Sequence, residues 1–302
     1  MDTNSNALPN DLVTATFNLP GLALTAASPT YQLYEGEETV LGLALEFRAA
    51  GGAVDTDAHI ITDVTSIELW DGETQIMKPM TPEELILLHN RYRTGPKVAR
   101  TADSGLIPIP ILPMDVPLTL TAAHFGLGRL TDDGSGISKL RVVVNWAAAI
   151  VTVTSCIPIV TIDPTERRAK LGRHYRVDRI TYTQAGTGEQ QIPEVFRDSN
   201  AFSCKELLVN TAVGVFVNCT VRQGAEFRYL QTRPPMLDQL AEDAGLTAIA
   251  DRQVILFNTR NDPSSTLRLR GFSPAMLTVN WSGAPGASDI IAIKEYDGHV
   301  TW

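Results

Sequence analysis

Two stretches of the chain decide its fold: Thr65-Ser-Ile-Glu-Leu-Trp-Asp-Gly72 and Val217-Asn-Cys-Thr-Val-Arg-Gln-Gly224. In both, apolar residues alternate with polar ones up to a terminal glycine, which is typical of a half-buried β-strand followed by a tight turn. The two glycines are 152 residues apart (224 − 72), about half of the 302-residue chain. The same offset relates Pro82 to Pro234, Leu85 to Leu237 and Leu88 to Leu240. The pattern predicts a strand, a turn, a second strand and a short helix in each half.

Each predicted helix has recognisable start signals. Thr81-Pro-Glu-Glu84 is a capping box, in which the threonine hydroxyl accepts from a backbone amide and Glu84 reaches back to the helix start. Leu85 and Leu88 then share one face. In the second half, Thr232 leads into Pro234-Pro235. The apolar face there comprises Leu237, Leu240, Ala241 and Ala244, and Gly245 is the predicted stop.

The repeat continues beyond the helices. Ile107-Pro-Ile-Pro-Ile-Leu112 corresponds to Val254-Ile-Leu-Phe257, an apolar strand after each helix. Val143-Val-Asn-Trp146 then matches Thr278-Val-Asn-Trp281, at a shorter offset of 135 residues (281 − 146). A glycine-rich insertion from His124 to Gly136 in the first half accounts for the shorter offset. We expect both tryptophans to lie inside the folded units.

These matches predict an all-β chain made of two similar sandwiches in tandem. Turn-and-strand patterns recur by chance in β-proteins, but an ordered series with a helix in the same place favours duplication. We place the first unit at residues 1–158, with a polar N-terminal arm at residues 1–10, and the second at residues 159–302. The junction is expected near Ser155 to Pro164, where prolines limit regular structure.

Composition narrows the class of protein. Apolar residues make up 44% and charged residues 20%, as in globular proteins, and the net charge of −9 argues against a surface that coats nucleic acid. Cys156, Cys204 and Cys219 are too few and too far apart for a disulfide framework and fit a reducing compartment. The first residues show no signal-peptide pattern. The uncharged run between Arg141 and Asp163 contains Asn145 and Pro158, and we interpret it as two short strands rather than a membrane span.

The predicted hairpins and helices also carry a family resemblance. The residues concerned are Ile67-Glu-Leu-Trp-Asp-Gly-Glu-Thr-Gln-Ile-Met77 with Thr81 to Arg91 in the first half, and Gly186-Thr-Gly-Glu-Gln-Gln-Ile-Pro193 with the strand before Gly224 in the second. This order resembles the PM2-like double jelly-roll bacteriophage major capsid proteins over roughly residues 60–300. The chain is somewhat longer than the family member that it resembles, and it has its own insertion around Asp132-Asp133.

The resemblance implies two tandem eight-stranded jelly-roll barrels, each with a short helix after a β-hairpin. It implies a homotrimer of pseudo-hexagonal outline, in contact with neighbouring trimers and with penton and minor capsid proteins. Such trimers form an icosahedral shell around an internal viral membrane, which is a further implied contact, and no direct contact with nucleic acid is implied. The protein would be part of the virion and be assembled in the cytoplasm of a bacterial host.

Catalytic and cofactor motifs are absent from the sequence. There is no nucleophile elbow, zinc-binding His-Glu-x-x-His or phosphate loop, and the five histidines (His59, His89, His124, His174 and His299) do not have metal-ligand spacing. The carboxylate pair Glu83-Glu84 fits a helix cap, and Asp132-Asp133 fits a turn, although a structural calcium ion at the latter stays an alternative. We expect no enzymatic activity, no cofactor and no catalytic metal.

The strongest charge feature runs from Arg167 to Arg179, with five arginines and one lysine against one aspartate. We expect this segment to pair with carboxylates of a neighbouring subunit, a task for which the arginine fork is well suited. A solvated strand edge and contact with anionic lipid headgroups are the alternatives. The candidate contact residues are Arg167, Arg168, Arg173 and Arg176, with the terminal Trp302 as an anchor to a neighbour.

Two other functions fit a β-rich chain of this size. One is a carbohydrate-binding or glycan-hydrolysing β-sandwich with loops of one sandwich forming the cleft, for which an aromatic platform is expected. Aromatic residues make up only 7% of the chain. The other is a minor spike or vertex protein of the same viral lineage.

Overall fold

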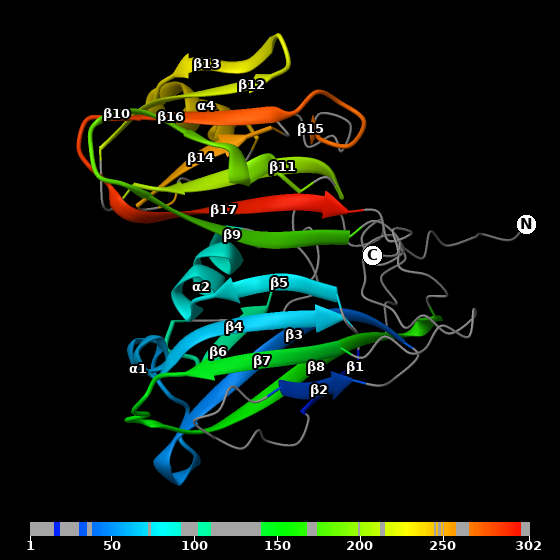
Figure 1. Ribbon diagram of the computed structural model, residues 1–302. Helices are drawn as coiled ribbons and strands as arrows, with labels where there is room; N and C mark the ends of the chain where they lie inside the picture. The colour runs from blue at the N-terminus through cyan, green and yellow to red at the C-terminus, as the bar shows by residue number, and fades with distance from the viewer. Residues whose placement is uncertain are drawn as a thin grey trace, which may run out of the picture. The chain divides into compact units, whose positions relative to one another are not determined.

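The computed structural model divides the chain into two compact units, Met1–His174 and Tyr175–Trp302 (Figure 1). We call them unit 1 and unit 2. The structure describes residues 15–18, 30–34, 38–71, 74–91, 102–109, 140–167, 174–198, 200–211, 215–244, 246, 249, 251–257 and 266–296. The described residues are mostly β-strand with few helices, as predicted.

Unit 1 contains strands in two antiparallel sets. One set pairs in the order β1-β8-β3-β6 and the other in the order β2-β7-β4-β5. The strands are β1 (Ala15–Asn18), β2 (Thr30–Tyr34), β3 (Glu38–Ala49), β4 (Val64–Asp71), β5 (Thr74–Met80), β6 (Leu106–Ile109), β7 (Leu140–Trp146) and β8 (Val153–Arg167).

Short helices join the strands of unit 1. A 3-10 turn, η1 (Ala50–Gly52), and the helix α1 (Asp57–Asp63) connect β3 to β4, and α2 (Pro82–Arg91) follows β5. The capping box of α2 is confirmed: the Thr81 amide donates to Glu84 Oε2 at 2.8 Å, and the Glu84 amide donates to Thr81 Oγ1 at 3.2 Å. Leu85 and Leu88 are both fully buried. Sequence reasoning did not predict α1.

Unit 2 repeats this plan. Its first set of strands pairs in the order β10-β16-β12-β13 and its second in the order β9-β17-β11-β14, with the two-residue β15 beside β11. The strands are β9 (His174–Gln184), β10 (Gly188–Ile192), β11 (Ala201–Asn210), β12 (Phe216–Gln223), β13 (Glu226–Thr232), β14 (Arg252–Leu256), β15 (Leu267–Arg268), β16 (Ala275–Trp281) and β17 (Gly286–Tyr296).

The helices of unit 2 are η2 (Pro193–Phe196) and α4 (Pro234–Asp243). As predicted, α4 follows the hairpin of β12 and β13, just as α2 follows the hairpin of β4 and β5. Leu237 and Ala241 are buried, whereas the N-cap residue Arg233 makes no capping hydrogen bond with its side chain. The predicted stop at Gly245 lies outside the described residues.

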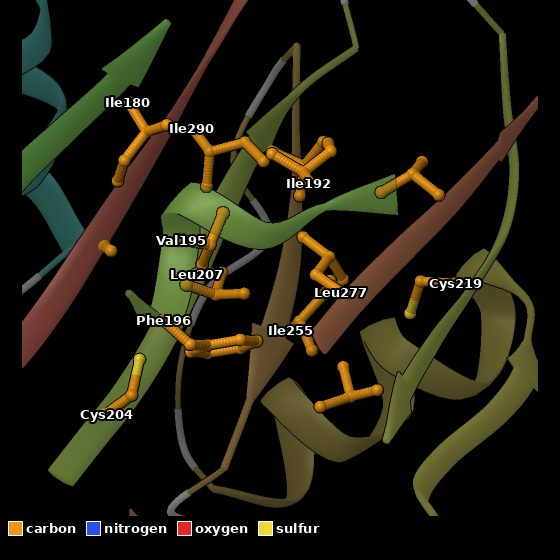
Figure 2. Close-up of a cluster of buried hydrophobic side chains, with 14 of the residues drawn as sticks. Ile180, Ile192, Val195, Phe196, Cys204, Leu207, Cys219, Ile255, Leu277 and Ile290 are labelled. Carbon is orange, nitrogen blue, oxygen red and sulfur yellow. The ribbon is translucent and has the colours of Figure 1, made fainter. Parts of the chain in front are cut away.

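Each unit has its own apolar core. Figure 2 shows the core of unit 2, where Ile192, Leu207, Leu277 and Ile290 from both sets of strands converge with η2. Both predicted core tryptophans are confirmed as buried. Phe47 meets Trp146 in unit 1, and Phe216 meets Trp281 in unit 2, each ring pair edge to face at centroid distances of 6.0 and 5.9 Å.

The uncharged run between Arg141 and Asp163 forms β7, an irregular connection and the start of β8, as predicted. No helix among the described residues is long and apolar enough to span a membrane. Residue 158, where the first unit was predicted to end, lies within β8, and the two compact units are Met1–His174 and Tyr175–Trp302. Pro158 keeps regular register opposite Leu45, and Pro164 lies in a bulge, so neither proline ends the strand.

Candidate functional site

The structure describes the side chain of one predicted contact residue, Arg176. Arg167 is the last residue of β8, and its side chain lies outside the described part of the structure, as do Arg168, Arg173 and Trp302. The subunit contacts assigned to these residues stay a prediction. The predicted insertion from His124 to Gly136, with its alternative calcium site at Asp132-Asp133, also lies outside the described residues.

Arg176 lies on β9 in a buried cluster of charged and polar side chains of unit 2. Its guanidinium carbon is 4.0 Å from the centroid of the Tyr296 ring. The Tyr296 hydroxyl donates to Asp198 Oδ2 at 2.6 Å and lies 3.4 Å from Asp178 Oδ2. Lys294 Nζ donates to the same Asp178 oxygen at 2.9 Å. We call these five residues the charge cluster.

Burial and mutual pairing set the protonation of the charge cluster. Burial lowers the pKa of Arg176, and the neighbouring Tyr296, Asp178 and Asp198 partly oppose that shift. Burial acts to raise the pKa of Asp198, but hydrogen bonds from Tyr296 and the Asn200 amide outweigh it, so the pKa lies below its usual value. Burial, the charge of Asp178 and the bond to Asp198 raise the pKa of Tyr296. The cluster therefore pairs two basic and two acidic side chains around a neutral hydroxyl.

The charge cluster ties the first residues of β9 to the last residues of β17. Lys294 and Tyr296 alternate on β17, as Arg176 and Asp178 do on β9, so each pair shares one face of its strand. Asp198 joins from the segment after η2. The sequence signal for this cluster was Arg176 and Asp178 at alternate positions near the start of β9, with Lys294 and Tyr296 at alternate positions at the end of β17. Of these residues, only Arg176 was singled out from the sequence. These contacts hold the start of β9 close to the end of β17.

The other candidate reactive groups lie in environments that fit a structural role. All three cysteines are buried and free, and burial raises the pKa of Cys204 and Cys219 to about 12, so the reactive thiolate is scarce at neutral pH. Glu84 serves the helix cap, as predicted. His59 Nδ1 lies 2.8 Å from the buried carboxylate of Asp55. Within the described ranges, no three His, Cys, Asp or Glu side chains are grouped to hold a metal ion.

An exposed apolar edge in unit 2 was not found from the sequence. β13 is the last strand of its set, and a register shift between the pairs Val221–Tyr229 and Cys219–Thr232 produces a bulge. Leu230 lies in that bulge and is 61% exposed. Met236, in the first turn of α4, is 55% exposed. We call Leu230 and Met236 the assembly edge, because exposed apolar groups beside an edge strand favour association.

Comparison with known proteins supports the fold of this chain but does not assign the chain to a sequence family. No family model matches the chain, and no curated protein sequence matches it. Among solved structures, the major capsid protein P2 of bacteriophage PM2 matches with a TM-score of 0.74, at 12% identity, over 94% of this chain and 97% of that protein. The chain shares the fold of that capsid protein. The resemblance to the PM2-like capsid proteins is thereby confirmed at the level of structure.

Two further viral proteins have a similar fold. VP54 of PBCV-1 matches at 11% identity over 94% of this chain and 93% of that protein, with a TM-score of 0.59. The STIV MCP matches at 10% identity over 95% and 97%, also with a TM-score of 0.59. Each match covers both units, so the likeness is not limited to one half of the chain.

Proposed function

We propose that this chain is the major capsid protein of an icosahedral virus of the PM2 type. The observation that carries the proposal is the match to the phage PM2 capsid protein across both units, at a TM-score of 0.74. The duplicated strand order within the chain supports it independently, since β1-β8-β3-β6 recurs as β9-β17-β11-β14 and β2-β7-β4-β5 recurs as β10-β16-β12-β13.

In this proposal each unit is an eight-stranded jelly-roll barrel, one on each side of a boundary near the end of β8. Two similar barrels in one chain allow three chains to present six nearly equivalent edges, so a closed trimer can tile a hexagonal lattice. The proposed partners are a second and third copy, neighbouring trimers, and penton and minor capsid proteins. The shell would surround an internal membrane without binding nucleic acid directly.

The proposed role is assembly rather than catalysis. The charged groups brought together in unit 2 are paired with one another around Tyr296, and the three thiols are buried. The assembly edge and the basic residues Arg167, Arg168 and Arg173 are the proposed contacts with other copies. The proposed location is the virion, following assembly in the cytoplasm of a bacterial host.

The test is the oligomeric state of the purified full chain. Size-exclusion chromatography with light scattering should give a particle of about 98 kDa, three times the chain mass of 32.8 kDa, without added ligand. Charge reversal of Arg167, Arg168 and Arg173 should weaken the trimer, and Leu230→Ser with Met236→Ser should do the same. A monomer that persists at high protein concentration would overturn the proposal.

A matched control substitution distinguishes a specific contact between subunits from a general effect of altering the surface. Val215 is 64% exposed and lies next to the first residue of β12, outside the assembly edge. Val215→Ser should leave the trimer intact. If Val215→Ser and the Leu230 and Met236 variants weaken the trimer equally, the assembly edge is not a specific contact.

A further inference from the structure

Two exposed phenylalanines lie at one end of unit 2. Phe227 follows the turn between β12 and β13 and is 51% exposed, and Phe272 lies in the connection between β15 and β16 and is 53% exposed. Figure 1 shows this turn and this connection at the same end of the unit. Two hydrogen bonds hold them together: the Gly224 amide donates to the Pro274 carbonyl at 3.4 Å, and Gln223 Nε2 donates to the Arg268 carbonyl at 2.5 Å.

Each phenylalanine has an arginine over its ring. The Arg222 guanidinium carbon lies 5.8 Å from the Phe227 centroid, and that of Arg268 lies 6.0 Å from the Phe272 centroid. Two more exposed arginines are close in sequence, Arg228 beside Phe227 and Arg270 two residues before Phe272, with Glu226 as the acidic neighbour. We call Phe227, Phe272 and these four arginines the turn-end patch. It is strongly basic on a chain whose net charge is −9.

The β12–β13 turn of the turn-end patch differs in charge from its counterpart in unit 1, where Arg141 also lies over an aromatic ring, 5.6 Å from the Trp70 centroid. The corresponding turn of unit 1 reads Asp71-Gly72-Glu73, and the residue at the position of Arg222 is Trp70. Trp70 is half-buried and donates from Nε1 to Glu68 at 3.2 Å. Contacts that exploit the likeness of the two units would use features present in both. Among the described residues, the exposed combination of phenylalanines and arginines occurs at this end of unit 2, and it points to a partner other than a further copy of the chain.

We propose that the turn-end patch binds the surface of an anionic phospholipid bilayer. Aromatic rings favour the boundary between headgroups and acyl chains, and basic residues are attracted to an anionic membrane surface. Exposed rings beside arginines suit a bilayer surface, where phosphate headgroups meet acyl chains, and the test below separates this partner from single-stranded nucleic acid. This inference rests on the proposed function, and it names the residues through which the coat would face a membrane.

The test is flotation of the full chain with unilamellar vesicles. Vesicles of phosphatidylcholine alone are compared with vesicles containing about a third phosphatidylglycerol, at low and high salt. The wild-type chain should float with the anionic vesicles at low salt only. Phe227→Ser with Phe272→Ser, and separately Arg222→Gln with Arg268→Gln, should each lower the bound fraction more than about tenfold. Val215→Ser, an equally exposed apolar substitution elsewhere in unit 2, should bind like the wild type.

Light scattering of the same samples separates the two proposals. A trimer that does not bind anionic vesicles overturns the lipid inference and leaves the proposed function in place, whereas a monomer that binds them does the reverse. Binding that both double variants retain overturns the inference, as does wild-type binding to single-stranded DNA in preference to vesicles. A loss of the trimer in both double variants would show that a second copy occupies the patch, and it would also overturn the inference.

Discussion

Units 1 and 2 share their apolar framework and differ in their polar connections. Both have a hairpin, a proline-led helix, two sets of strands in the same order and an edge-to-face contact between phenylalanine and tryptophan. Among the described residues, the buried charged side chains of the two units make different contacts. Unit 1 uses the carboxylate of Asp63, and unit 2 uses the charge cluster around Tyr296. The comparison indicates that strand order depends on apolar periodicity, while each unit fixes its loops and ends with its own polar groups.

Asp63 shows how unit 1 fixes a loop with a polar side chain. The side chain is fully buried at the end of α1, and it accepts from the amides of Val151, Thr152 and Val153 at 3.0, 2.8 and 2.8 Å and from Thr152 Oγ1 at 3.0 Å. One carboxylate therefore holds the connection between β7 and β8, in which Val151 is 75% exposed. In unit 2, the corresponding connection instead bonds to Val215, whose carbonyl accepts from the Ser282 amide at 3.0 Å.

The largest effect is expected from breaking the charge cluster. Lys294→Met leaves the buried Asp178 carboxylate without its ammonium partner, and it should lower the free energy of unfolding by about 3–5 kcal/mol in urea titrations. Lys294→Met combined with Asp178→Asn should recover most of this loss. As a control, Lys78→Met on the exposed face of β5 should cost less than about 1 kcal/mol. Equal losses at both lysines would show that the cluster contributes no pairing energy.

The second largest effect on stability is expected when the Asp63 carboxylate of unit 1 is replaced. Asp63→Asn replaces an acceptor of four hydrogen bonds with a group that also donates, and it should cost about 3 kcal/mol. Hydrogen exchange read by mass spectrometry should speed up at Val151, Thr152 and Val153, while the amides of β16 and β17 in unit 2 stay protected. Rapid exchange throughout both units would show that the effect of Asp63 is not confined to its own unit.

The pH dependence of Asp63 has a definite sign. Burial acts to raise its pKa, but the hydrogen bonds from Val153, Val151 and Thr152 outweigh burial, so the pKa lies below its ordinary value of 3.8. The stability that Asp63 contributes is therefore complete above that value and is lost as the pH falls through the lowered folded-state pKa. Asp63→Asn should flatten this part of the acid unfolding curve.

A smaller effect is expected at the turn of unit 2. Gly224 has a φ of +59°, and a Cβ there would lie 2.9 Å from Ser273 Cβ and Oγ. Gly224→Ala should cost about 1–2 kcal/mol for the left-handed backbone alone, measured as a lower thermal midpoint. Adding Ser273→Gly should return only the part due to the contact. Full recovery in the double variant would mean that the backbone conformation carries no penalty.

The smallest effect on stability is expected at the starts of α2 and α4, which differ in their capping. Thr81→Ala removes the capping box of α2 and should cost about 1 kcal/mol. Arg233→Ala at the start of α4 should change stability by less than about 0.5 kcal/mol, because that side chain makes no capping bond. Urea unfolding of both variants provides the comparison, and a larger cost at Arg233 would contradict it.

Sequence periodicity was sufficient for the repeated hairpins, the two helices that follow them and the buried tryptophans, because each depends on neighbours within a few residues. Pro158 and Pro164, at the expected junction, lie within β8, which pairs with β3. Long-range polar contacts were not predictable: Asp63 meets residues nearly ninety positions away, and Asp178 meets Lys294 across 116 positions. The exposure of Leu230, Phe227 and Phe272 also required the folded chain, because alternation alone does not show which strand is last in its set.

We propose that two matched units in one chain let three copies form a six-sided tile. Negative-stain images of the purified full chain test it most directly, through class averages computed without imposed symmetry. We expect threefold particles with six lobes of similar size around the rim. Particles with two or four lobes, or single chains that stay apart at every concentration, would contradict it.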